Sequence, residues 1–189
     1  MVPAIGPAVI GIAISRRVPF PVGLRLAGRR VVVVGQSDAA GRRLELLAGT
    51  GADVVRAPCP PSDDDLRGAF LVLLCATDET VAAALDARAR SGEFLLCCLD
   101  SERGFFEMPA VVRRGLLQVA ISTSGAAPGL AARMRKAFER LLPEALGPFV
   151  DRLAALRESL AGATSEDRRA RMMDAVAGVE VEGKLRLPE

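Results

Sequence analysis

The chain of 189 residues contains no histidine, tryptophan or tyrosine. The absence of histidine excludes Ser-His-Asp and Cys-His catalytic groups, and every zinc site that needs an imidazole ligand. Any acid–base chemistry must therefore come from Asp, Glu, Cys, Lys or hydroxyl groups. Lysine is also scarce, since only Lys136 and Lys184 are lysines among the 25 basic residues.

The chain also lacks an excess of charge of either sign, with 25 basic and 23 acidic residues and a net charge of +2. No basic block with interleaved aromatic residues is present, so nucleic acid is not an expected partner. Hydrophobic residues make up 50% of the chain and charged residues 25%. This composition predicts a folded globule and excludes disorder over the whole chain.

The four cysteines form no Cys-x-x-Cys pair. Cys75, Cys97 and Cys98 lie in apolar runs, which favours buried, reduced thiols and a cytoplasmic protein. Cys97 and Cys98 are adjacent, so their side chains would point to opposite faces of a strand. We therefore do not expect them to form a disulfide or to share a metal ion.

Residues 1–15 are uncharged and apolar, and arginines follow them at Arg16 and Arg17. A signal peptide carries its positive charge first, and a membrane span needs about 20 apolar residues. Neither pattern fits this segment, so no membrane partner is expected. We expect residues 1–18 to be a poorly ordered extension or the product of an upstream start codon, with membrane anchoring as the lesser alternative.

Apolar runs alternate with helical segments through the first part of the chain. Strands are expected at 30–35, 52–55, 69–75 and 93–99, helices at 39–48 and 81–90, and a short helical turn at 63–65. Apolar runs without polar alternation are typical of parallel strands that are buried on both faces. The sequence therefore predicts an α/β fold, a Rossmann-like open parallel sheet with helices on both faces.

Beyond this sheet the pattern changes. Two short strands are expected at 107–112 and 117–122, and helices at 129–142, 146–160 and 165–176. A smaller β-then-α region therefore completes the chain.

The turn after the first strand is a candidate phosphate site, because free N–H groups and the positive end of a helix dipole converge there. Its residues are Gly35, Gln36, Ser37, Asp38, Ala39 and Ala40. They follow the Gly-x-Gly-x-x-Gly/Ala fingerprint except that Ser37 replaces the second glycine. Asp38 is expected to cap the helix. An ordinary strand-to-helix turn that binds no nucleotide explains the motif equally well.

The acidic residue that would hold the ribose hydroxyls of a dinucleotide is expected about 20 positions further on. Arg56 and Ala57 occupy that place. A bound 2′-phosphate is one interpretation of Arg56, and a surface arginine is the favoured one.

Two further positions are candidates for chemistry. Asp100 ends a strand at the carboxyl edge of the sheet, where apolar neighbours could raise its pKa and suit it to general-base work. A turn-forming aspartate is the alternative. A hydroxyl-rich turn before a helix suits an anionic ligand, or simple helix capping. Its residues are Ser122, Thr123, Ser124 and Gly125.

The order of these segments resembles the siroheme synthase N-terminal family of precorrin-2 dehydrogenases and sirohydrochlorin ferrochelatases. The resemblance covers residues 19 to about 160 and depends on the order of several segments. The segments are Phe20–Leu26, Gly28–Gly35, Ala69–Val72, Ala76–Asp78, Leu99–Asp100, Phe106–Gly115 and Val119–Pro128.

The resemblance implies an NAD-dependent oxidation of precorrin-2 to sirohydrochlorin and, in some members, insertion of Fe²⁺ or Co²⁺ at the same site. It implies that Asp100 is the proton acceptor in both steps, and that residues 122–125 contact the tetrapyrrole. NAD would be held by residues 35–40 together with Thr77 and Asp78. The resemblance also implies a homodimer formed through residues 105–160.

Four regions are therefore expected: an extension (1–18), a Rossmann-like NAD-binding domain (19–104), a dimerisation region (105–143) and a helical tail (144–189). The chain ends before any methyltransferase domain, so uroporphyrinogen methylation is not expected.

The chain departs from the family pattern at several positions, among them Ser37. A helix and a strand of the family pattern are missing between Val55 and Leu66. These departures leave two alternatives open. One is a metal chelatase that works without a cofactor, and the other is a non-catalytic tetrapyrrole-binding dimer.

Overall fold

The computed structural model describes residues 18–99, 101, 103–184 and 186. Residues 1–17, for which an extension is expected, lie outside this set. The chain divides into two compact units after Met108, close to the boundary expected between residues 104 and 105. Each unit is described by itself. Within the described residues, no helix is long and apolar enough to cross a membrane.

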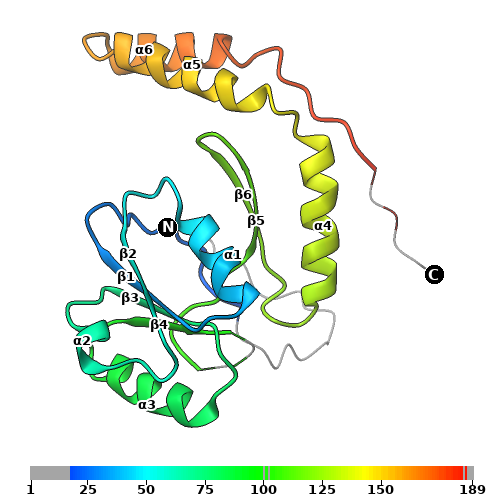
Figure 1. The fold of residues 1–189 in the computed structure, drawn as a ribbon. Helices are drawn as coiled ribbons and strands as arrows, with labels where there is room; N and C mark the ends of the chain where they lie inside the picture. The colour runs from blue at the N-terminus through cyan, green and yellow to red at the C-terminus, as the bar shows by residue number, and fades with distance from the viewer. Residues whose placement is uncertain (1–17, 100, 102, 185, 187–189) are drawn as a thin grey trace, which may run out of the picture. The chain divides into compact units, whose positions relative to one another are not determined.

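The first unit contains a four-stranded sheet in the order β2–β1–β3–β4 (Figure 1). Its strands are β1 (Arg30–Val34), β2 (Asp53–Ala57), β3 (Leu71–Leu74) and β4 (Leu95–Cys98). All neighbouring strands are parallel. The chain runs outward from β1 to β2 and then crosses back to β3, so the carboxyl ends of β1 and β3 are adjacent. This confirms the predicted α/β class.

Helices cover both faces of this sheet. Successive side chains of a strand point to opposite faces, so each strand contributes to a core on either side. The helices are α1 (Asp38–Leu47), α2 (Asp63–Leu66) and α3 (Glu79–Arg90). Val31 and Val33 share one core with Leu47 of α1. Val32 and Val34 share the other core with α3. All four valines are fully buried, which explains why the strand sequence has no polar alternation.

The strand and helix ends differ slightly from the expected ones. The strand expected at 52–55 continues to Ala57, because the Gly35 N–H donates a hydrogen bond to the Ala57 carbonyl oxygen at 3.0 Å. The helix expected to start at Val81 starts at Glu79. Asp78 caps it by accepting a hydrogen bond from the Val81 N–H at 3.0 Å.

The second unit consists of an antiparallel hairpin and three helices. The hairpin pairs β5 (Ala110–Arg114) with β6 (Leu117–Ile121), and the helices are α4 (Pro128–Leu141), α5 (Leu146–Ser159) and α6 (Ser165–Asp174). The first strand was expected from residue 107, but it begins after Pro109, which has no N–H to donate to a ladder. The Arg114 side chain donates to the carbonyl oxygens of Glu139 (2.8 Å) and Leu142 (2.9 Å), which attaches the hairpin to the end of α4.

Candidate functional site

The turn after β1 lies against the end of β3. Gly35 has a φ of +120°, and a side-chain carbon at this residue would lie 3.1 Å from the carbonyl oxygen of Cys75. Glycine fits this position because it tolerates both the positive φ and the close backbone approach. The turn of residues 35–40 therefore lies at the carboxyl edge of the two central strands, where open α/β sheets bind ligands.

The start of α1 differs from the expectation, because Ser37 and not Asp38 occupies the N-cap position. Asp38 is already the first helical residue. The Ser37 hydroxyl donates a hydrogen bond to the Cys75 carbonyl oxygen at 3.0 Å, and no side chain of the described residues caps the first turn. The position of Ser37 is set by the strand pairing and by this hydrogen bond to a distant residue. The local sequence around Asp38 therefore could not predict that Ser37 is the N-cap residue.

The uncapped first turn of α1 leaves backbone N–H groups without a side-chain acceptor. Such groups point out of the helix end, where the helix dipole favours negative charge. Neutral donors at a glycine turn, close to the ends of two parallel strands, fit the pyrophosphate of a dinucleotide. Residues 35–40 can therefore bind a cofactor phosphate through these backbone N–H groups.

Thr77 and Asp78, the other predicted cofactor residues, follow β3 on the same edge of the sheet. The Asp78 carboxylate caps α3, and Thr77 is exposed. Both line an open pocket of about 130 Å³, together with Glu79 and Ser101. Ligand pockets usually measure roughly 300 Å³ or more, so this pocket would hold only part of a dinucleotide.

The predicted general base, Asp100, lies outside the described residues. The backbone on either side of it is held in place. The Leu99 N–H donates to the Leu74 carbonyl oxygen at 2.9 Å, and the Phe105 N–H donates to the Leu96 carbonyl oxygen at 2.8 Å. Gly104 has a φ of +100°, and an added side-chain carbon would lie 2.4 Å from the Leu96 oxygen. The residues on either side of Asp100 are thus hydrogen-bonded to the carboxyl end of β3 and to β4.

Asp86 of α3 holds this same segment, and the sequence had not singled it out. Among the described residues it is the one charged side chain in the buried class, with 6% exposed. Its carboxylate accepts hydrogen bonds from Arg90 Nε at 2.8 Å and from the Gly104 N–H at 3.1 Å. The Arg90 hydrogen bond in particular lowers the pKa of Asp86. The sequence could have indicated a buried Asp86, because this acid lies four residues after Ala82 and so falls on the apolar stripe of α3.

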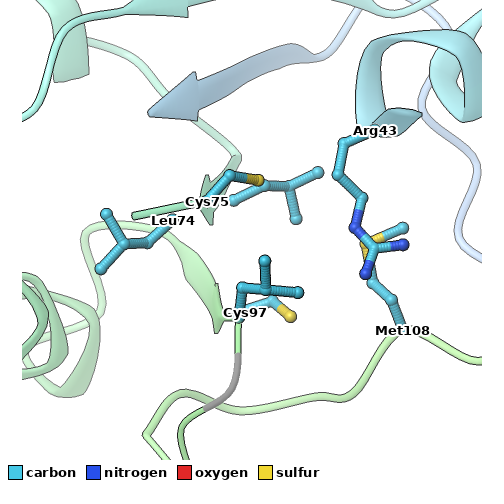
Figure 2. A pocket seen from close by; sticks show the side chains of 7 residues that line it. Arg43, Leu74, Cys75, Cys97 and Met108 are labelled. Carbon is cyan, nitrogen blue, oxygen red and sulfur yellow. The ribbon is translucent and has the colours of Figure 1, made fainter. Parts of the chain in front are cut away.

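A second, much smaller pocket on the α1 side is lined by sulfur and one guanidinium. Figure 2 shows Arg43 extending from α1, with Cys75, Cys97 and Met108 around the same pocket. Burial raises the pKa of the Cys97 thiol to about 11 and also raises that of Cys75. At neutral pH these thiols are mainly protonated, which makes them poor nucleophiles. Sequence analysis did not identify Arg43 as a pocket residue.

The four cysteines differ in burial: Cys75 and Cys98 are buried, whereas Cys59 and Cys97 are half-buried. All four thiols are free. Cys97 packs in the α1-side core and Cys98 in the α3-side core, so they do face opposite sides of β4. Within the part of the chain that the structure describes, no three His, Cys, Asp or Glu side chains are grouped to hold a metal ion.

The hydroxyl-rich turn of residues 122–125 belongs to the second unit and immediately precedes α4. Ser122 Oγ accepts a hydrogen bond from the Ser124 N–H at 3.0 Å. Thr123 Oγ1 accepts one from the Ala127 N–H at 3.1 Å. Ser124 has a φ of 53°, which is uncommon for a residue other than glycine. These bonds favour a capping role, and both hydroxyls keep a proton that can be donated to a ligand.

The structure thus brings residues 35–40 and residues 77–78 to one edge of one sheet. It adds Arg56, whose Nε donates to the Gly35 carbonyl oxygen at 3.1 Å, so that a cation lies beside the glycine turn. The sequence placed Arg56 at the end of a strand, but this contact crosses from β2 to the turn after β1 and depends on the tertiary fold.

A parallel sheet with an open glycine turn at its carboxyl edge defines the class of Rossmann-like dinucleotide-binding domains. Two family models match the chain: "Putative NAD(P)-binding" over residues 22–110 and "Sirohaem biosynthesis protein central" over residues 114–141. Together with the relatives below, these matches confirm the resemblance to the siroheme synthase N-terminal family.

Siroheme synthases of two bacteria are similar in sequence. The one from Gluconacetobacter diazotrophicus is 32% identical over 177 residues, covering 80% of this chain and 38% of the relative. The one from Gluconobacter oxydans is 32% identical over 168 residues, covering 76% of this chain and 36% of the relative. The chain therefore spans less than half the length of these curated relatives.

Among solved structures, SirC, a precorrin-2 dehydrogenase, has a similar fold. The TM-score is 0.67 at 22% sequence identity, and the match covers 84% of this chain and 89% of SirC. This likeness confirms the Rossmann-like fold.

Proposed function

We propose that the chain oxidises precorrin-2 to sirohydrochlorin in siroheme biosynthesis, with NAD as the hydride acceptor. The observation that carries this proposal is the uncapped first turn of α1 beside Gly35, in a domain that matches an NAD(P)-binding family. The sirohaem central domain that follows it supports the tetrapyrrole substrate. The printed functions of the similar proteins, siroheme synthase and precorrin-2 dehydrogenase, support the same reaction.

In this proposal each group has a separate task. The N–H groups of residues 35–40 bind the pyrophosphate, and Thr77 and Asp78 line the space beyond it. NAD, when bound, accepts the hydride that leaves the macrocycle. The hydride leaves from a carbon of the macrocycle, and Asp100 accepts the proton lost from a second position, so that two electrons and two hydrogens are removed in total. This division of work requires no imidazole.

The second unit supplies the substrate contacts in the proposal. Ser122, Thr123, Ser124 and Gly125 contact the tetrapyrrole. The hydroxyls of Ser122 and Thr123 accept hydrogen bonds within the turn and can still donate their protons to the substrate. A homodimer forms through residues 105–160. Fe²⁺ or Co²⁺ would be a further substrate, inserted into the product while Asp100 accepts the pyrrole protons.

A cofactor-independent chelatase is the second candidate. It is favoured by the sheet itself, which ends at β2, with only the four-residue α2 between β2 and β3. The missing helix and strand would have lined the adenosine side of a dinucleotide site. A non-catalytic tetrapyrrole-binding dimer is the remaining alternative.

Calorimetric titration of NAD and NADP into the purified chain separates these candidates. The dehydrogenase proposal predicts saturable binding of at least one cofactor. No binding to a folded protein would contradict it and leave the chelatase or the binder. The Asp100→Ala variant then separates enzyme from binder, because a binder has no turnover to lose. Full turnover by this variant would contradict the assignment of the base.

A further inference from the structure

The carboxyl end of β2 is where a Rossmann-like domain meets the ribose of the adenosine half, and a carboxylate there normally accepts hydrogen bonds from the ribose hydroxyls. In this chain β2 ends with Arg56 and Ala57. Arg56 lies 21 residues after Gly35, the spacing at which that carboxylate is expected. A cation therefore replaces the usual anion.

Arg56 faces the side of the sheet on which α1 lies. Val54 packs against the α1-side core, and Arg56 is two residues further along the same strand, so both side chains share this face. The Arg56 Nε donates to the Gly35 carbonyl oxygen at 3.1 Å. This bond holds the guanidinium beside the turn whose N–H groups would bind the pyrophosphate.

The rest of the Arg56 guanidinium is available. One N–H is used on a neutral carbonyl group, while an arginine side chain has five N–H donors. The side chain is exposed, and no carboxylate of the described residues forms a salt bridge with it.

The acidic residues that follow β2 have other partners. Asp63 pairs with Arg88 at 2.8 Å, and Asp64 pairs with Arg67 at 2.5 Å. Asp65 closes a capping box by accepting from the Ser62 N–H at 2.8 Å. None of them is placed to accept from a ribose diol at the end of β2, and none offsets the charge of Arg56.

We propose that Arg56 binds the 2′-phosphate of NADP, so that this chain prefers NADP to NAD. The inference rests on the proposed nicotinamide site and changes the cofactor from the NAD that the family resemblance implies. An arginine binds a phosphate through two parallel charged hydrogen bonds. The missing carboxylate removes the repulsion that an acid at this position would exert on a 2′-phosphate.

The test uses calorimetry on the full chain, with NADP and NAD as one pair of ligands. Adenosine 2′,5′-bisphosphate and 5′-AMP form a second pair, which differs by the 2′-phosphate and contains no nicotinamide. We expect the phosphorylated member of each pair to bind about tenfold more tightly, since a charged hydrogen bond contributes about 1.5 kcal/mol or more. Added salt should reduce this preference, because the pair is exposed.

Two variants assign the preference to one side chain. Arg56→Gln should remove most of the tenfold preference and change NAD binding by less than about threefold. Arg67→Gln is the matched control: it removes an exposed arginine whose salt-bridge partner, Asp64, is also on the surface. This control should keep the wild-type preference. Circular dichroism of each variant checks that it is folded.

The outcomes separate this inference from the proposed function. Loss of the preference in Arg56→Gln alone supports the inference. Binding of NAD with no 2′-phosphate preference in the wild type, or an equal loss in both variants, overturns the inference and leaves the dehydrogenase proposal standing. Binding of none of the four ligands to the folded wild type overturns both.

Discussion

The hydroxyl of Ser37 donates a hydrogen bond of 3.0 Å to the carbonyl oxygen of Cys75, 38 residues further along the chain. The bond joins the turn after β1 to the loop after β3, the two segments that would surround a dinucleotide. It also explains why Ser37 sits at the N-cap of α1 without capping it. The same contact that fixes the turn thus leaves the helix N–H groups open.

Replacing Ser37 with alanine tests this relationship. Ser37→Ala should lower the free energy of unfolding by about 1 kcal/mol, the usual contribution of one hydrogen bond, and should weaken dinucleotide binding because the turn is less well held. Urea unfolding and calorimetry measure the two effects. Ser91→Ala is the control, because Ser91 makes a local hydrogen bond to Arg88 in the exposed end of α3. An equal loss of binding in both variants would contradict this role of Ser37.

Gly104 should be intolerant of a side chain. With a φ of +100° and an added carbon 2.4 Å from the Leu96 oxygen, Gly104→Ala must move the segment that follows Asp100. We expect a loss of about 2 kcal/mol or more in the free energy of unfolding. Gly92→Ala has a similar φ of +89° with nothing within 4 Å of the added carbon, so its loss should be smaller. Equal losses in urea unfolding would refute the steric explanation.

Asp86 should make stability depend on acid pH. Its pKa in the folded chain is lowered from the ordinary value of 3.8. The stabilisation is therefore present above the unfolded pKa and is lost as the pH falls through the lower folded pKa. The wild type should be more stable than Asp86→Asn at neutral pH, and the difference should shrink as the pH falls below 3.8. Urea unfolding of both proteins across this range measures the effect, and a difference that is constant with pH would contradict it.

The core cysteines should be unreactive in the folded protein. Burial raises the pKa of Cys97 and of Cys98 to about 11, so little thiolate is present near neutral pH. Titration with a thiol reagent at mildly alkaline pH should modify Cys59 first, since it is less buried than Cys75 and Cys98. The others should react after unfolding. Rapid modification of Cys97 in folded protein would contradict the assignment of a protonated thiol.

The sequence predicts this fold well where local pattern and burial agree. Val31 to Val34 are all buried, so an unbroken apolar run is sufficient to locate β1. The start of α1 is different, because the bond from Ser37 to Cys75 depends on the register of β1 and β3. Asp38 was therefore a reasonable but wrong choice of cap.

The candidate site was only partly predictable for the same reason. Residues 35–40 follow a recognisable turn pattern, and the resemblance points to Thr77 and Asp78. Arg56 and Asp86 act through partners 21 and 18 residues away. A residue's role in such contacts cannot be deduced from its sequence neighbours. The role of Asp100 rests on its place after an expected strand and on the resemblance, because it lies outside the described residues.

The most direct test of the central proposal is the formation of reduced nicotinamide by the purified chain, supplied with precorrin-2 and either NAD or NADP in the absence of oxygen. We predict one reduced cofactor for each sirohydrochlorin formed, and loss of turnover with retained cofactor binding in Asp100→Ala. If the folded wild type binds precorrin-2 but reduces neither cofactor, the chain is not a precorrin-2 dehydrogenase.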